Sequence, residues 1–363
     1  MTEREAMRRA LALARRGWGR VHPNPMVGAV VLASGGVAGE GYHAEFGQAH
    51  AEPVALAAAG AGARGSTLVV TLEPCAHQGK QPPCVEPIIA AGVARVVAAA
   101  ADPNPAAGGG AARLRAAGIE VSLGLLECEA RLQNAAFFHQ FRKPARPWVA
   151  LKLATSLDYR IADRAGRSKW LTSPAAREFV HSLRAGFDAL AVGGRTAILD
   201  DPSLTVRGPI APRVPPRRVV FEGSEPIPES LALVRSAHDQ PTIVVTAHAT
   251  AAPTGARLGP HGVVVMEAGT PAQALAALRR AGVGTLLVEG GGRLAGSLLR
   301  DGLVDRFYWI QSPLWLGGAG VAAVSGWELA GLAEAERWSV IERRGLGEDS
   351  LLVLERKPCS PAS

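Results

Sequence analysis

The sequence predicts a two-domain α/β protein, and three observations support this fold class. The chain has 363 residues, which is enough for two domains that each bury a sizeable core. Apolar runs typical of strands alternate with helical segments along its length, as expected for sheets covered by helices. A basic, proline-punctuated segment at Arg142–Pro147 interrupts this alternation. We therefore expect one domain over residues 1–145 and a second over residues 147–363.

The first domain is expected to begin with a helix, because Thr2 and Glu5 form a capping box. This helix should stop near Gly17. The elements expected after it are a rigid loop at 22–25, strands at 27–32 and up to Tyr42, a helix at 50–61, a strand at 67–71, a helix at 84–91, a strand at 94–100, a helix at 111–117 and a strand at 119–125.

The second domain continues the alternation. Its expected strands are 148–153, 189–192, 218–221, 242–246, 262–266, 285–289 and 304–311, and its expected helices are 174–184, 271–281 and 293–300. Residues 208–216 contain four prolines and are expected to form a loop. The tail after Lys357 is expected to be frayed.

Composition argues against several classes of protein. The net charge of +7 comes mostly from arginines that are scattered rather than clustered, and aromatic residues make up only 5%, so we expect no nucleic-acid partner. No apolar run is long enough to span a bilayer, and the charged N-terminus lacks a secretory signal. Cys128 and Cys359 are too isolated to suggest a disulfide framework. A cytoplasmic location without membrane contact is expected.

The segment from His50 to Cys84 carries the strongest chemical signal. His50, Cys75 and Cys84 can bind Zn²⁺ through three protein ligands, which leaves the fourth tetrahedral position to water, as in catalytic sites. Glu52 follows His50 by two residues and can move the protons of that water. This His-x-Glu and Pro-Cys…Cys pattern is typical of zinc deaminases.

The segment also fits two other interpretations. The cysteines can be inert buried thiols, or the site can be a structural zinc site in which His77 is the fourth ligand. The deaminase interpretation is favoured because only there does Glu52 have a function.

Further polar residues lie near the expected metal. Asn24, held between two prolines, can direct its amide toward a flat heterocycle or can simply form a turn. His77 and Lys80 lie in the 76–83 loop between the cysteines, where they can contact the substrate or be solvated loop residues. Both alternatives remain open for these three residues.

Two glycine turns in the second domain each follow a predicted strand: Gly193-Gly194 and Gly290-Gly291-Gly292. A strand, glycines and a helix N-terminus can bind a phosphate, although the glycines can equally serve tight turns that need positive φ. The second turn matches the dinucleotide fingerprint poorly, because Ala295 stands where the third glycine would be.

Taken together, these motifs resemble the bifunctional riboflavin-biosynthesis enzymes, a pyrimidine deaminase fused to a pyrimidine reductase. The resemblance rests on segments that span nearly the whole chain: His22–Gly28, His50–Glu52, Thr71–His77, Pro82–Cys84, Asp102–Pro105, Lys152–Asp158, Trp170–Ser173, Gly193–Thr196, Asp200–Arg207 and Glu289 to Asp305. One departure concerns Tyr159, which stands where this family usually has glycine.

The resemblance implies a cytidine-deaminase-like α/β/α sandwich followed by a dihydrofolate-reductase-like α/β domain. It implies zinc-dependent removal of the 2-amino group of 2,5-diamino-6-(ribosylamino)-4(3H)-pyrimidinone 5′-phosphate, followed by NADPH-dependent reduction of the ribosyl group to ribityl. The partners would be this phosphorylated pyrimidine and NADPH, and the protein would be a homo-oligomer.

Residue roles are carried over by position. Glu52 and Lys152 would be catalytic, with Lys152 and Glu289 bracketing the reacting sugar. The residues implied to contact the reductase substrate are Ser168, Arg184, Leu204, Arg207 and Glu289. The residues implied to contact NADPH are Ala154, Trp170, Thr196, Asp200, Gly291, Gly292, Arg293, Leu294, Ala295, Gly296 and Ser297. A core tryptophan and solvated arginines are the alternatives for these residue types.

The sequence also fits two rival functions. The first is a zinc deaminase of a nucleoside or RNA base with a C-terminal binding domain, which should neither bind nor oxidise NADPH. The second is a zinc-stapled structural protein without turnover.

Overall fold

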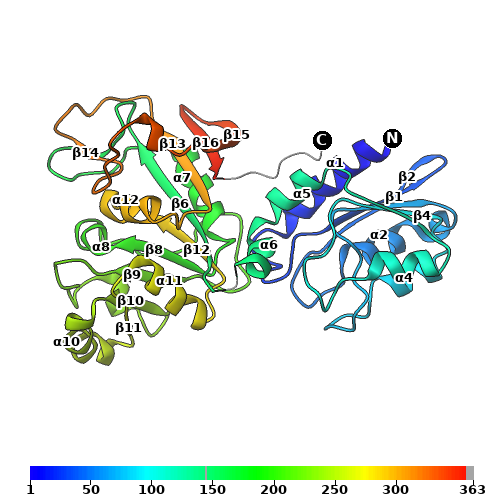
Figure 1. The fold of residues 1–363 in the computed structure, drawn as a ribbon, viewed down its shortest axis with the longest axis horizontal. Coiled ribbons are helices and arrows are strands. Elements are labelled where there is room, and N and C mark those ends of the chain that lie inside the picture. Colours follow the sequence, from blue (N-terminus) through cyan, green and yellow to red (C-terminus); the bar gives the residue numbers. More distant parts are fainter. Residues whose placement is uncertain (144, 357–363) are drawn as a thin grey trace. The chain divides into compact units, whose positions relative to one another are not determined.

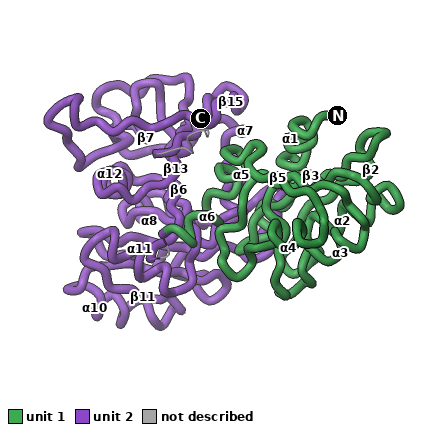
Figure 2. Tube along the Cα trace, turned by 45° about the vertical axis from the view of Figure 1, so that its right-hand side comes forward, with its two compact units in different colours: residues 1–142, 359–363 green, residues 143–358 purple. Residues whose placement is uncertain are grey.

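The computed structural model describes residues 1–143 and 145–356. Within them the chain divides into two compact units, Met1–Arg142 and the residues from Lys143 onward (Figures 1 and 2). The expectations for the tail after Lys357 and for Cys359 lie outside the described residues. No helix in the described ranges is both long and apolar enough to cross a membrane.

The first unit is built on a five-stranded sheet in the order β2-β1-β3-β4-β5. Strand β1 pairs antiparallel with β2 and β3, whereas β3, β4 and β5 are parallel. The strands are β1 (Gly28–Ala33), β2 (Gly36–Tyr42), β3 (Thr67–Val70), β4 (Arg95–Ala98) and β5 (Glu120–Leu123). The helices are α1 (Glu3–Ala14), η1 (Arg15–Gly17), α2 (Ala51–Ala59), η2 (Gly60–Ala63), α3 (Val85–Ala90), α4 (Gly110–Ala116), α5 (Glu127–Gln133) and α6 (Ala135–Arg142).

Glycines set how closely two helices approach this sheet. A Cβ on Gly28 would lie 2.0 Å from the Ala10 carbonyl oxygen of α1, and one on Gly41 would lie 2.5 Å from the Ala51 carbonyl oxygen of α2. Gly41 pairs with Ala29, the neighbour of Gly28 in β1. Successive residues of a strand face opposite sides of the sheet, so α1 and α2 cover opposite faces. The α/β/α sandwich expected from the sequence is confirmed, and α2 brings His50 and Glu52 to one edge of it.

The second unit is built on a nine-stranded sheet in the order β11-β10-β9-β8-β12-β6-β13-β16-β15. Its strands are β6 (Trp148–Thr155), β8 (Ala189–Gly193), β9 (Arg217–Phe221), β10 (Thr242–Thr246), β11 (Val264–Glu267), β12 (Thr285–Glu289), β13 (Arg306–Gln311), β15 (Ser339–Leu346) and β16 (Asp349–Glu355), with a separate pair β7 (Arg160–Ala162) and β14 (Val321–Ala322). Its helices are α7 (Pro174–Arg184), α8 (Gly194–Asp200), α9 (Ala232–Arg235), α10 (His248–Leu258), η3 (Gly259–His261), α11 (Pro271–Arg280), α12 (Gly292–Arg300) and η4 (Leu332–Glu334).

The sheet from β11 to β13 is parallel, and only β16 and β15 extend it antiparallel. In open parallel sheets, ligands bind beyond the carboxyl ends of the strands. The register makes Lys152 of β6 and Glu289 of β12 direct neighbours. The sheet, in which β6 and β12 are adjacent strands (Figure 1), therefore brings together two candidate residues that are far apart in the sequence.

The structure also contains elements that the sequence pattern did not predict. Helices α5 and α6 cover the first unit, where Ala130 and Phe138 pack into its core. Helix α10 contains Pro253, which weakens any helical signal, and packing of Leu258 compensates. The β15–β16 hairpin lies beyond the last predicted strand.

Candidate functional site

The three predicted metal ligands converge in the first unit. Their ligand atoms lie within 4.8 Å of one another, with His50 Nδ1 3.2 Å from Cys84 Sγ and 3.7 Å from Cys75 Sγ. Zinc bonds of about 2.0–2.3 Å in a tetrahedron put ligand atoms roughly 3.5 Å apart, so this set fits a zinc ion. Among the described residues the group contains these three and not His77. The four-ligand structural alternative is therefore not supported.

Local structure explains why the ligands meet. His50 is the N-cap residue of α2 and Cys84 is that of α3, while Cys75 lies in the loop after β3. The hydrogen bond from the Cys84 thiol, with help from His50 and against the effect of burial, holds the pKa of Cys75 well below its ordinary value. This shift favours the thiolate, the form that binds metal.

Glu52 lies in the first turn of α2 and its side chain is buried. Burial raises the pKa of Glu52 to about 7, against smaller opposing effects that include the charge of His50. A carboxyl group that titrates near neutral pH can both accept and return a proton. Glu52 therefore has the acidity that a proton shuttle needs and lies beside, not within, the ligand group.

Asn24 contacts a histidine that the sequence motifs did not identify. Its Nδ2 lies 3.4 Å from Nε2 of His43, and His43 Nδ1 lies 3.1 Å from the Ala49 carbonyl oxygen. The His43 ring is buried and meets the His50 ring edge-on, with centroids 5.2 Å apart. Asn24 does lie in a turn, where its backbone amide donates to Val21, and its side chain contacts His43, whose ring lies against that of the metal ligand His50. The one available signal for His43 was its position directly after β2.

The 76–83 loop lies between the cysteine ligands. Nδ1 of His77 is buried and has no hydrogen-bond partner within the described part of the chain, so a ligand can supply one. The Lys80 ammonium lies over the Phe46 ring, 4.3 Å from its centroid. Both side chains remain candidates for substrate contacts.

Glu73 ties the metal loop to the Asp102–Pro105 turn. Its buried carboxylate accepts hydrogen bonds from the backbone amides of Asp102 (3.2 Å) and Ala111 (2.9 Å). Burial raises the pKa of Asp102 to about 6. The 102–105 turn is one of the segments on which the family resemblance rests. Its structural function is to brace the segment that carries Cys75.

The second unit contains a cavity of about 980 Å³ beyond the carboxyl ends of β6, β8 and β12. Most of the residues carried over for the reductase line it: Lys152, Ala154, Ser168, Trp170, Arg184, Thr196, Asp200, Leu204, Glu289, Gly291, Gly292, Arg293, Leu294 and Ser297. Three predicted residues are not among the described lining residues: Arg207, Ala295 and Gly296. Ala295 packs in the core instead, and Gly296 lies against the Ser325 carbonyl.

Lys152, Glu289 and Arg184 form a buried charged cluster at one wall of this cavity. Arg184 donates two hydrogen bonds to Glu289, 2.5 Å from Nε to Oε1 and 3.0 Å from Nη2 to Oε2, and Lys152 Nζ lies 3.8 Å from Oε2. Burial lowers the pKa of Lys152, with Glu289 opposing. Burial disfavours the Glu289 carboxylate, but Arg184 and Lys152 together hold its pKa below the ordinary value. The cluster therefore contains one carboxylate between two cations.

The turn before α12 joins the end of β12 to a helix N-terminus through three glycines. Gly290 and Gly291 have φ of 84° and 87°, which explains the need for glycine there. A Cβ on Gly291 would lie 3.2 Å from Thr196 Oγ1. The positive φ values confirm the tight-turn interpretation. Phosphate binding stays a prediction, which the position of the turn at the N-terminus of α12 favours. Gly193, with φ of −75°, needs no such explanation.

The other wall carries polar and aromatic side chains. Ser168 Oγ lies 3.4 Å from Asp200 Oδ1, and burial raises the pKa of Asp200. Trp170 is 73% exposed, with the Arg177 guanidinium 4.7 Å from its ring centroid, so it is not a core tryptophan. The cavity is thus lined by a large exposed indole and by the glycine turn, and both features fit a dinucleotide cofactor such as NADPH.

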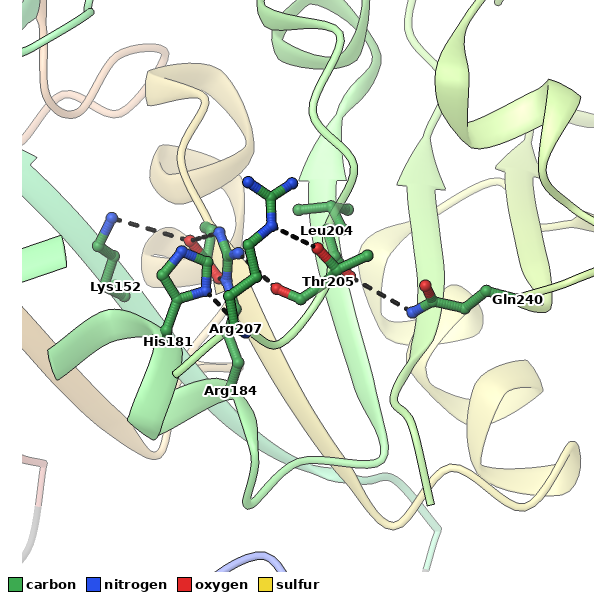
Figure 3. Close-up of polar contacts among 8 residues, drawn as sticks. Lys152, His181, Arg184, Leu204, Thr205, Arg207 and Gln240 are labelled. Carbon is green, nitrogen blue, oxygen red and sulfur yellow. Dashed lines mark hydrogen bonds and ion pairs between the residues drawn. The ribbon is translucent and has the colours of Figure 1, made fainter. Parts of the chain in front are cut away.

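Arg207 and His181 complete the neighbourhood (Figure 3). The Arg207 guanidinium donates to Thr205 Oγ1 (3.2 Å) and Ser203 Oγ (3.3 Å), and its backbone amide donates to His181 Nδ1. His181 lines the cavity although no motif pointed to it. The available signal was its position three residues before Arg184, on the same helical face.

Comparison with known proteins gave matches over nearly the whole chain. The cytidine and deoxycytidylate deaminase zinc-binding region matches residues 1–100, and the RibD C-terminal domain matches residues 147–344. The riboflavin biosynthesis protein RibD of Aquifex aeolicus is 38% identical over 98% of each chain, and that of Escherichia coli is 38% identical over 98% of this chain and 99% of its own.

Solved structures agree with these matches. Acinetobacter baumannii RibD, form 1, is similar with a TM-score of 0.84 and 34% identity, covering 98% of this chain and 99% of its own. A diaminohydroxyphosphoribosylaminopyrimidine deaminase/5-amino-6-(5-phosphoribosylamino)uracil reductase from Thermotoga maritima has a TM-score of 0.83 and 34% identity, with the same coverage.

Proposed function

The chain belongs to the RibD family of bifunctional riboflavin-biosynthesis enzymes, and we propose that its two units act in turn on one phosphorylated pyrimidine. It is a zinc-dependent deaminase and an NADPH-dependent reductase. The observation that carries the first activity is the convergence of His50, Cys75 and Cys84 beside a buried Glu52. The domains proposed to carry the two activities are residues 1–145 and 147–363.

The first step is hydrolysis of the 2-amino group of 2,5-diamino-6-(ribosylamino)-4(3H)-pyrimidinone 5′-phosphate. When bound, zinc supplies the Lewis acidity for this hydrolysis. Glu52 accepts a proton on its carboxylate and returns it to the departing amine, a function that its pKa near neutrality supports. The Asn24 amide and His77 hold the pyrimidine ring, and the Lys80 ammonium binds the phosphate of the substrate.

The second step reduces the ribosyl group to ribityl, giving 5-amino-6-(ribitylamino)uracil 5′-phosphate. NADPH, when bound, supplies the reducing equivalents. The Lys152 ammonium polarises the sugar oxygen and gives it a proton, while Glu289 keeps Lys152 charged inside a buried site. Ser168, Arg184, Leu204 and Arg207 would orient the phosphorylated sugar.

The residues around the glycine turn fit NADPH. Thr196, Gly291 and Gly292 offer a hydroxyl and backbone amides to the pyrophosphate, and the exposed Trp170 can cover a nicotinamide or adenine ring. Gly296 would act from behind this surface, by allowing α12 to pack close to Ser325, and Ala295 by packing in the core beneath the turn.

We also propose a homo-oligomer in the cytoplasm. Among the described residues, Cys75, Cys84 and Cys128 form no disulfide, which suits a reducing compartment. A deaminase of RNA bases is not favoured, since it would leave the cavity and its charged cluster without a function.

A coupled assay tests the proposal. Purified protein with zinc and NADPH is given the diamino pyrimidine phosphate, and ammonia release and loss of NADPH absorbance are followed together. We expect ammonia first and NADPH loss after it. Ammonia release without any NADPH loss would contradict the reductase half, and NADPH-independent deamination of RNA would favour the rival.

A further inference from the structure

His181 lies on a rigid element in the reductase cavity. It belongs to α7, which begins at the N-cap Ser173 and contains Arg184 one turn further on. Residues three apart on a helix lie on the same face, so both side chains reach the same cavity wall. A histidine on a helix beside a binding residue is well placed to touch the same ligand.

One ring nitrogen of His181 is already engaged. The backbone amide of Arg207 donates to Nδ1 over 3.3 Å, and Arg184 Nη1 donates to the neighbouring Thr205 carbonyl over 2.9 Å. Helix α7 thus holds the Thr205–Arg207 segment at two points (Figure 3). Because Nδ1 accepts a hydrogen bond, the neutral ring carries its hydrogen on Nε2.

The surroundings keep the ring neutral. Burial lowers the pKa of His181, and Arg184 and Arg207 act in the same direction, against smaller opposing effects of Glu289 and the Thr205 backbone. Figure 3 shows the ring beside Arg207, whose backbone amide donates to it. The Nε2–H group is therefore a neutral donor in a cavity that is otherwise rich in cations.

We propose that His181 is a substrate-binding residue of the reductase, which donates the hydrogen of Nε2 to an oxygen of the substrate's phosphorylated sugar. This inference rests on the proposed reductase function. Phosphate and sugar hydroxyl oxygens are both acceptors, and both belong to the part of the substrate that Lys152 and Arg184 would bind. His181 adds to this recognition a donor whose direction is set by its bond to Arg207.

Two substitutions separate substrate binding from loop positioning. In His181→Asn the amide oxygen can replace Nδ1 as acceptor, but the donor at Nε2 is lost. In His181→Gln the amide nitrogen can replace the Nε2 donor, but the acceptor for Arg207 is lost. We expect His181→Asn to raise KM for the deaminated pyrimidine about 10- to 100-fold, the effect of losing a hydrogen bond to a charged group. His181→Gln should raise it less.

Direct titration with inorganic phosphate and with ribose 5-phosphate locates the contact. Weaker binding of both ligands to His181→Asn indicates a phosphate oxygen, and weaker binding of ribose 5-phosphate alone indicates a sugar oxygen; either supports the proposal. Wild-type KM and binding in His181→Asn, or a larger loss in His181→Gln, would overturn it.

Controls keep the test interpretable. His248→Asn changes an exposed histidine on α10, with a side chain that is 87% exposed, and should leave KM unaltered. Ammonia release and NADPH affinity check that each variant is folded. If wild-type protein fails to oxidise NADPH, the reductase proposal fails, whereas the ribose 5-phosphate titration still tests His181.

Discussion

Replacing Glu289 with glutamine removes the only carboxylate of the Lys152–Glu289–Arg184 cluster while keeping the shape of the side chain. Lys152 and Arg184 would then be two buried cations without a counter-charge. Their side chains are 17% and 15% exposed, and that of Glu289 is 7% exposed, so water screens the pair poorly. The change should therefore destabilise the second unit and impair its chemistry.

The size of the loss follows from the burial. Breaking a buried ion pair by removing one partner costs about 3–5 kcal/mol. We expect the lower end, about 3 kcal/mol, because glutamine keeps one acceptor oxygen for Arg184. In a unit of this size each kcal/mol lowers the unfolding temperature by about 2–4 °C, so the midpoint should fall by about 6–12 °C.

Calorimetry and NADPH oxidation together measure the two effects. The transition that moves when zinc is chelated belongs to the first unit, and Glu289→Gln should leave it in place. Reduction should fall at least ~100-fold. Any residual activity should decline at lower pH than in wild type, because Glu289 raises the pKa of Lys152 and only the protonated lysine can donate.

A matched control is available at the pair Arg306–Glu355, whose side chains are 12% and 11% exposed. Glu355 is not among the described residues of the cavity wall. Glu355→Gln should cost similar stability with unchanged NADPH affinity. Equal unfolding temperatures for Glu289→Gln and wild type would refute the reasoning. The double variant Glu289→Gln/Arg184→Met lacks one of the two uncompensated cations, so it should be more stable than Glu289→Gln alone. A double variant that is no more stable would also refute the reasoning.

Three further predictions concern single residues. Glu52→Gln should lower the deamination rate by a factor of about 10²–10⁴ and leave reduction of the deaminated substrate unaltered. Metal analysis should still find one zinc per chain, and loss of zinc would contradict a shuttle role. Lys152→Ala should abolish reduction and spare ammonia release. In the wild type, the alkaline limb of the reduction rate should lie below the usual lysine pKa, since burial lowers it; a limb at the usual value would count against Lys152 as the donor. Tyr159 has φ of 61° and packs against Trp309 with ring centroids 5.3 Å apart. The free energy of unfolding of Tyr159→Gly, measured in urea, should stay within about 1 kcal/mol of wild type, because relief of backbone strain offsets the lost ring contact. Tyr159→Val should lose about 1–2 kcal/mol, and a stable valine variant would show that the position carries no strain.

The metal centre could be predicted from the sequence because its geometry is mostly local. His50 and Glu52 share the start of one helix, and Cys75 and Cys84 bound one loop, so short segments bring the chemistry together. Spacing of this kind can be recognised in the sequence as a motif. The alternation of strands and helices likewise predicted most of both sheets.

The residues of the cavity in the second unit could be predicted only in part from the sequence. Lys152 and Glu289 become neighbours through the parallel register of β6 and β12, which no spacing in the sequence encodes. Their pairing was expected only through the family resemblance. Ala295 shows the limit of such a transfer, because it matches by position but packs in the core.

The sequence by itself determined the fold class, the candidate zinc ligands and the carboxylate that we propose as the proton shuttle, since these depend on periodicity and on neighbours along the chain. The tertiary structure alone decided that His43 supports Asn24, and that His181 faces the cavity while holding the Arg207 amide. A lone histidine carries no periodic or spacing signal. What it does depends on which backbone and side-chain groups the fold places within hydrogen-bonding distance of its two nitrogens.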